Sequence, residues 1–135
     1  MSALRTYLAL ALLPLMGQEP TKTSFSVLAS FDYTEGMQLP KEVTDLDEVE
    51  VTISGFMRRE VPGGSAVNQF MLVNDACGCT GTPKLNEIVF CTLPDGVTMD
   101  VKVGIVTVTG KLYVGEEKED GVVIMIYQMD ADTVK

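Results

Sequence analysis

The chain has 135 residues, 46% of them hydrophobic, with no tryptophan and no histidine. That length suits one domain with a modest core, and the composition is that of a globular protein. Lysine and arginine number 10 against 19 acidic residues, a formal net charge of −9. Because nucleic-acid binding draws its affinity from neutralising phosphates, so acidic a chain is a poor candidate for binding DNA or RNA. The lack of histidine also excludes catalytic triads and dyads that use imidazole as the base.

Residues 1–17 have the pattern of a secretory signal peptide. Arg5 precedes an apolar run from Thr6 to Met16, after which Gly17 begins a polar stretch. A run of 11 residues is too short to span a bilayer but suits the hydrophobic region of a signal. The alternative is a buried hydrophobic helix, against which Pro14 argues. We therefore expect cleavage after residue 17 and a periplasmic or otherwise exported protein, with no stable membrane span once the signal is removed.

Residues 18–42 are expected to form a linker and a leading strand. The first part is polar, and the side chains of Phe25, Val27 and Ala29 then alternate in a pattern that continues to Tyr33. Alternation of this kind predicts a strand over 25–33. The acidic residues of this region favour a solvated face over a metal site.

From Glu48 onward the sequence alternates between predicted strands and turns. In the stretch 48–54, Val49, Val51 and Ile53 point one way and polar residues the other, which indicates a half-buried strand. Further strands are expected at 67–74, 86–93, 103–117 and 122–130, with turns at 61–65, 94–96 and Asp120-Gly121. Gly55 and Gly110, each inside a long strand, indicate a bulge or a bend.

Five strands, two of them interrupted by glycine, predict an all-β fold over residues 43–135. We expect a small five- to six-stranded barrel like the oligonucleotide/oligosaccharide-binding (OB) fold, preceded by the N-terminal signal segment. A β-sandwich is the alternative, but that fold usually has seven strands. Closure would also protect the edges of a strand as hydrophobic as 122–127. The fold alone does not indicate a function.

Four segments together resemble a known family: VEVTISGFM, NQFMLVNDACGCTGTPKLNEIVF, VTVTGKLYV and GVVIMIYQMDADTV. They are similar to the bacterial envelope family catalogued as domain of unknown function 3299, over roughly residues 43–134. Cys77 falls on the cysteine of the family's Cys-x-His step and Asn86 on its asparagine, whereas Cys79 replaces the histidine and Glu87 a glutamine. The resemblance implies an exported, mostly β protein. Members are often associated with envelope transport systems, some of them metal-related, and no activity comes with the family.

The loop NDACGCTGTP holds Cys77 and Cys79 on either side of a glycine. Two thiolates suit Zn(II) or Cu(I), and exchange of histidine for cysteine preserves a metal ligand. Asp75 and Glu87 are candidate additional ligands, as are cysteines of a second subunit. The alternatives are a structural loop in which Cys77 is buried, and a disulfide, which would be strained in so small a ring.

No enzyme pattern emerges elsewhere. Cys91 alternates with apolar neighbours in 86–93 and is expected to be a small core residue. Ser65 has no histidine to activate it, and a Cys-x-Cys loop between strands differs from the Cys-x-x-Cys of thioredoxin-type enzymes.

The sequence therefore predicts a non-enzymatic exported module, an accessory or binding component of a transport-linked envelope system. Its working edge is expected at the loop 74–87, and its partner is expected to be an envelope protein or transporter. This function requires no cofactor. One alternative is a metal-binding protein that holds zinc or Cu(I) through Cys77 and Cys79, and another is a structural domain without a ligand.

Overall fold

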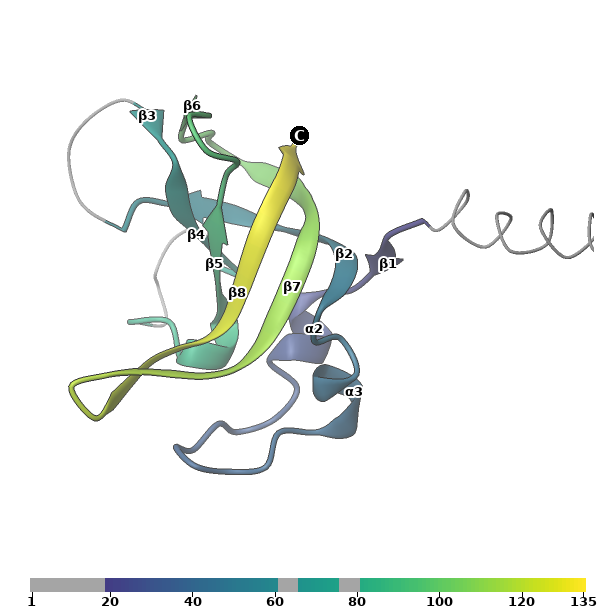
Figure 1. Cartoon of the computed structure of the whole chain (residues 1–135), viewed down its shortest axis with the longest axis vertical. Helices are drawn as coiled ribbons and strands as arrows, with labels where there is room; N and C mark the ends of the chain where they lie inside the picture. The colour runs from purple at the N-terminus through teal and green to yellow at the C-terminus, as the bar shows by residue number, and fades with distance from the viewer. Residues whose placement is uncertain (1–18, 61–65, 76–80) are drawn as a thin grey trace, which may run out of the picture.

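The structure is a computed structural model, and it describes residues 19–60, 66–75 and 81–135 (Figure 1). In chain order the elements are β1 (Thr21–Lys22), α2 (Phe25–Leu28), α3 (Lys41–Thr44), β2 (Val49–Arg58), β3 (Ala66–Val67), β4 (Gln69–Val73), the 3-10 helix η2 (Leu85–Glu87), β5 (Ile88–Thr92), β6 (Met99–Asp100), β7 (Ile105–Glu119) and β8 (Val122–Val134). None of the described helices is long and apolar enough to cross a membrane. The predicted signal peptide lies outside the described residues and stays a prediction.

Five strands close into a ring in the order β2, β4, β5, β8, β7, and β7 pairs again with β2 (Figure 1). Neighbouring strands are antiparallel except β5 and β8, which run parallel. β1 adds a short parallel pairing to β2, with Thr21 opposite Val51. Each strand of the ring therefore has a partner on both sides, which removes the edge that hydrophobic strands would otherwise expose. The prediction of a mostly β chain is confirmed.

The longest strands, β7 and β8, form a hairpin that turns at Asp120 and Gly121, with Glu119 opposite Val122. Both turn residues have positive φ, 52° and 79°. Two consecutive residues in this region make the type I′ turn, whose twist matches that of the flanking strands. The predicted turn is confirmed.

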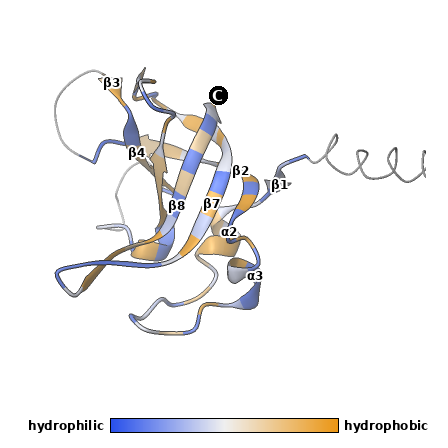
Figure 2. Cartoon of the chain, viewed as in Figure 1, coloured by the Kyte–Doolittle hydropathy of each residue, from blue (hydrophilic) through white to orange (hydrophobic). Residues whose placement is uncertain are grey.

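Alternate residues of the strands fill the interior of the ring. Val51 and Ile53 on β2 are at most 1% exposed, whereas the next residue, Ser54, is on the outer face and is exposed. Figure 2 shows the resulting bands of apolar and polar residues along β7 and β8. Cys91 is 1% exposed within this core, as predicted, and burial raises the pKa of its thiol. A neutral, buried thiol is a poor nucleophile.

The two glycines inside long strands serve different purposes. At Gly110 a Cβ atom would lie 2.2 Å from the carbonyl oxygen of Asp130, and the register of β7 against β8 shifts between Thr109 and Gly110. The irregularity predicted there is confirmed. At Gly55 the pairing with β7 is continuous, so of the predicted bulge or bend the bulge is not found there. A Cβ at Gly55 would instead meet the carbonyl oxygen of Val73 at 2.8 Å, which makes close packing the reason for glycine.

The predicted strand over 25–33 was wrong, because Phe25–Leu28 form the short helix α2. Phe25 and Leu28 are buried, whereas Val27 and Ala29 are only half-buried. The two buried residues are therefore three positions apart, as on one face of a helix, and not two apart, as on one face of a strand. The buried hydroxyl of Tyr127 donates a hydrogen bond of 2.7 Å to the Leu28 carbonyl and fastens α2 to the ring.

The segment after α2 is attached to β7 through Glu116. Its carboxylate accepts hydrogen bonds from the Tyr33 hydroxyl and from the backbone N–H of Gly36, the latter at 2.8 Å. These donors lower the pKa of Glu116, the Gly36 amide being the main cause. Burial, followed by the hydrogen bond to Glu116, raises the pKa of Tyr33 to about 12. The leading segment thus lies against the outside of the ring.

Candidate binding edge

Residues 81–88, which we call the edge segment, return the chain from the predicted loop to β5. The backbone N–H of Glu87 donates to the carbonyl oxygen of Lys84 at 2.9 Å and closes η2. The N–H of Lys84 donates in turn to the Glu87 carboxylate at 3.1 Å. These reciprocal bonds give the edge segment a defined shape. A hollow lies on each side of it.

Of the four predicted metal ligands, only Asp75 and Glu87 are among the described residues. Cys77 and Cys79 fall outside the described residues, so their assignment stays a prediction. Asp75 follows β4 and is half-buried, and the half-buried Glu87 carboxylate is engaged with Lys84. Within the described ranges, no three cysteine, aspartate or glutamate side chains gather as a metal site would require. The structure therefore brings no complete ligand set together in the part of the chain it describes.

The first hollow is polar and has a volume of about 390 Å³. Its lining residues come from α2, the segment after it, the end of β4 and η2: Phe25, Ser26, Ala29, Phe31, Asp32, Asn74, Lys84, Asn86 and Glu87. Asn86 is 2% exposed and donates from Nδ2 to the Phe31 carbonyl at 2.6 Å. Its Oδ1 is buried and has no partner among the described residues. Such an acceptor costs about 1–3 kcal/mol unless a donor reaches it.

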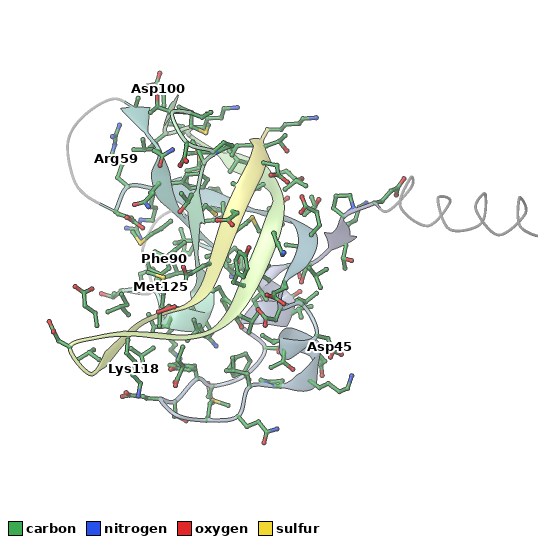
Figure 3. All side chains as sticks on the ribbon, in the orientation of Figure 1. Asp45, Arg59, Phe90, Asp100, Lys118 and Met125 are labelled. Atoms are coloured by element: carbon green, nitrogen blue, oxygen red, sulfur yellow. The ribbon has the colours of Figure 1, made fainter. Side chains whose placement is uncertain are left out.

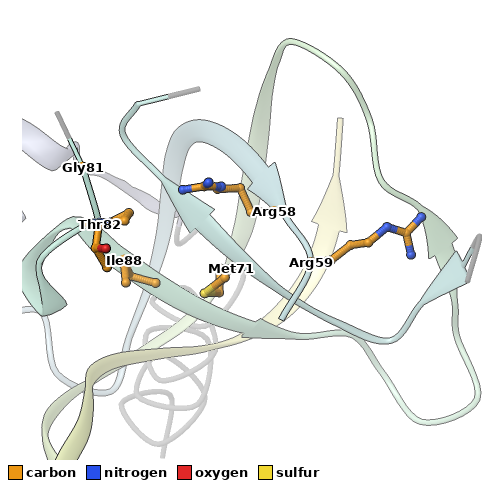
Figure 4. Close-up of a pocket in the computed structure, with 7 residues that line it drawn as sticks. Arg58, Arg59, Met71, Gly81, Thr82 and Ile88 are labelled. Carbon is orange, nitrogen blue, oxygen red and sulfur yellow. The ribbon is translucent and has the colours of Figure 1, made fainter. Parts of the chain in front are cut away.

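The second hollow has a volume of about 570 Å³ and lies over β2, β4 and β5 (Figure 4). It is lined by Arg58, Arg59, Met71, Gly81, Thr82, Pro83 and Ile88, and none of these described lining residues is acidic. We call it the arginine hollow. In Figure 4 the Arg58 side chain reaches toward Gly81 and Thr82, while that of Arg59 points the opposite way.

Arg58 is half-buried, yet no carboxylate of the described residues pairs with its guanidinium. Nineteen acidic residues are available in the chain against 10 basic ones. A guanidinium is a five-donor group that usually finds a carboxylate or phosphate when it is partly buried. The arginine hollow therefore presents a positive group whose partner is not supplied by the described chain.

Sequence reasoning singled out the loop 74–87 but not the arginine hollow beside it. The loop 74–87 was singled out for its cysteines, whereas Arg58 lies at the end of a strand some distance along the chain. The only signal for it was the pair Arg58-Arg59, two basic residues together in an acidic chain. That pair becomes informative once the fold places Arg58 opposite Thr82.

Comparisons with known proteins agree on one family. The family model described as "Protein of unknown function (DUF3299)" matches residues 15–135. A crystal structure of a DUF3299 family protein from Pseudomonas aeruginosa PAO1 is similar in fold, with a TM-score of 0.59 and 22% sequence identity. The alignment covers 87% of this chain and 95% of that one. No curated protein matches the chain.

Proposed function

We propose, from the premise that the chain belongs to the DUF3299 family, that it is a non-enzymatic binding module exported to the bacterial envelope. It acts there as an accessory component of a transport-linked system and meets its partner through the edge segment. The single observation that carries this proposal is the position of the two hollows. Both are lined in part by the edge segment. One is lined by Asn86, whose buried Oδ1 has no partner among the described residues, and the other by Arg58, with which no described carboxylate pairs.

The ring itself supports an assignment to small barrels of the OB type. Numbered by their order in the chain, the five strands neighbour one another as 1-2-3-5-4, and the last pairs back to the first. The third and fifth of these strands, β5 and β8, are parallel. Barrels of that type bind ligands on the outer face of the second and third strands and on the adjoining loops. Those strands are β4 and β5 here, beside the edge segment.

A cross-linking experiment tests the proposed edge. A photoreactive amino acid at Thr82 should give discrete covalent adducts with one envelope protein in intact cells. The same amino acid at Thr107, on the outer surface of β7, is the matched control and should give none. Equal adducts from both positions, or none from Thr82, would contradict the edge assignment.

Export is tested separately. Mature protein recovered from the periplasm should begin near Gln18, because the apolar run is followed by Gly17 and a polar stretch. Intact mass and N-terminal sequencing measure this. A cytosolic chain that retains Met1 would show that the signal assignment is wrong.

Metal binding through Cys77 and Cys79 is the second candidate function. The observation that favours it is the polar hollow, which is lined by Asp32, Asn86 and Glu87 and lies beside the cysteine loop in sequence. Oxygen groups of this kind complete zinc sites that begin with thiolates. A structural domain without any ligand remains as the third candidate.

Titration of reduced protein with Zn(II) against a competing chelator decides this second candidate. Cys77→Ser and Cys79→Ser should each abolish Zn(II) binding. The unsubstituted protein should release protons when it binds Zn(II), because its thiols bind as thiolates. Cys79→His should retain affinity, since it replaces one ligand by another. Cys91→Ser is the control and should leave affinity unchanged, because that thiol is buried in the core. Similar weak binding by all variants would exclude the cysteine site.

A further inference from the structure

Four side chains form a row across the outside of the ring, beginning at the arginine hollow. Arg58 on β2 is paired with Met71 on β4, Met71 with Phe90 on β5, and Phe90 with Gln128 on β8. Residues paired directly across strands project from the same face of a sheet. All four are half-buried. We call them the outer row.

The outer row changes in chemistry along its length. It has a cation at the β2 end, a thioether and an aromatic ring in the middle, and an amide at the β8 end. Met71 and Phe90 do not belong to the core cluster or to the partly buried side chains packed against it. Their apolar surface therefore faces outward. Figure 3 shows Phe90 on this side of the ring.

The charges around the row give it a direction. Two positions further along the strands, on the same face, Thr92 on β5 is opposite Asp130 on β8, and Asp130 is exposed. A negative charge thus lies near the β8 end. At the β2 end, none of the described residues that line the arginine hollow is acidic. An anionic group is favoured beside Arg58 and disfavoured beside Gln128.

We propose that the outer row and the arginine hollow together bind a small carboxylate that carries an apolar body. This inference rests on the proposed function and names the class of ligand that the edge takes. The carboxylate pairs with the Arg58 guanidinium, whose planar fork matches two carboxylate oxygens. The apolar body covers Met71, Ile88 and Phe90, and Gln128 offers hydrogen bonds at the far end.

Size and charge restrict the ligand further. Three spacings between neighbouring strands give a row about 14 Å long, and the hollow of about 570 Å³ is of the volume that holds a small molecule. The chain carries a net charge of −9, so its overall field opposes anions. One guanidinium offsets that repulsion for a single negative charge better than for two. A monoanionic carboxylate is therefore favoured over a phosphate monoester.

The test uses the mature chain and sodium octanoate as the probe, with 1-octanol and octylammonium as neutral and cationic molecules of the same chain length. Amide chemical shifts in ¹H–¹⁵N spectra report the site, and titration gives the dissociation constant. Octanoate should shift the amides of Arg58, Met71 and Phe90. It should bind at least about tenfold more tightly than 1-octanol, because one charge-assisted hydrogen-bonded pair is lost with the neutral probe. Hexanoate should bind more weakly than octanoate, since less apolar surface is covered.

Two matched variants separate the site from simple net charge. Arg58→Met keeps the length of the side chain and should weaken octanoate binding by about tenfold or more. Lys41→Met removes a charge of the same sign from an exposed residue of α3 that lines neither the arginine hollow nor the outer row, and its effect should remain within about twofold. Phe90→Ser should reduce the difference between hexanoate and octanoate.

Three results would overturn the inference: equal binding of octanol and octanoate, equal losses in Arg58→Met and Lys41→Met, or an absence of shifts at the outer row with every probe. Each is distinguishable from failure of the proposed function. If Thr82 still gives a specific cross-link while octanoate does not bind, the edge is correct and the ligand class is wrong. If octanoate binds at the row while Thr82 gives no cross-link, the ligand class stands and the envelope partner is wrong.

Discussion

Two outer surfaces of the same ring differ in whether their polar side chains have partners among the described residues. On the β2–β7 side, hydroxyl groups pair across the strands, Thr52 with Thr109 at 3.1 Å and Ser54 with Thr107 at 3.0 Å. On the side of β4, β5 and β8, the outer row sets a guanidinium, a thioether and an aromatic ring in succession, and no described carboxylate pairs with the guanidinium.

This difference indicates which surface is the candidate for binding, since the fold alone is compatible with many ligands. Hydroxyl pairs on a strand surface are compatible with water on their outer side, and they need no partner molecule. Half-buried apolar side chains beside a cation that no described carboxylate pairs with are stabilised when another molecule covers them. The core beneath is common to both surfaces, so the distinction lies in the outward-facing residues alone.

The largest effect is expected from a charge placed in the shared core. Ile53→Asp should destabilise the fold by at least about 3 kcal/mol, because an unpaired carboxylate would be buried where Ile53 is 1% exposed. That is a large part of the stability of a small domain. Ser54→Asp is the control and should stay folded, because Ser54 is the next residue along and is exposed on the outer face of β2 and β7. Circular dichroism and urea unfolding measure both, and a stable Ile53→Asp protein would mean that the inward face is wrongly assigned.

A smaller loss is expected at the register shift between β7 and β8 beside Gly110. Gly110→Ala should cost about 1–3 kcal/mol, since its Cβ would lie 2.2 Å from the Asp130 carbonyl oxygen and the backbone must move. Thr133→Ala, an exposed residue of β8 paired with Thr109, is the control and should change stability by less than about 0.5 kcal/mol. Urea midpoints compare the two. Equal, small effects would show that the strands can separate here without cost.

A still smaller change in stability is expected on the outer face of β2 and β7, where the hydroxyl groups pair. Replacing both Thr52 and Thr109 by valine removes the two partners of a hydrogen bond together and should alter stability by less than about 0.5 kcal/mol. Each single valine variant leaves one hydroxyl that can turn to water, so it too should be nearly neutral. Thermal unfolding of the three variants measures this. A double variant that loses more than about 1 kcal/mol would mean that this surface stabilises the ring and is not merely solvated.

The strands could be predicted from the sequence because alternation is a local signal. Val51 and Ile53 pointed inward as expected, and the Asp120-Gly121 turn formed where its residue types indicated. The helix α2 was missed because Phe25 and Leu28 are spaced for a helix while Phe25, Val27 and Ala29 also fit a strand. Over so short a stretch, packing against Tyr127 decides between the two.

The outer row could not be predicted in the same way. Its members lie on four strands, and their alignment depends on the register of each strand against the next. The sequence indicated the edge through the loop 74–87, but whether Arg58 has a carboxylate partner depends on the positions of distant residues. The same holds for the unpaired oxygen of Asn86, which is evident only when the residues around η2 are known.

The central claim is that Arg58 serves binding and not folding, and the unfolding free energy of Arg58→Met tests it most directly. Urea unfolding of the parent and the variant, without ligand, should give equal stabilities or a slightly more stable variant. The reason is that methionine can cover Met71 without leaving a guanidinium unpaired. A loss of more than about 1 kcal/mol would contradict the account, because Arg58 would then stabilise the fold through an interaction of its own.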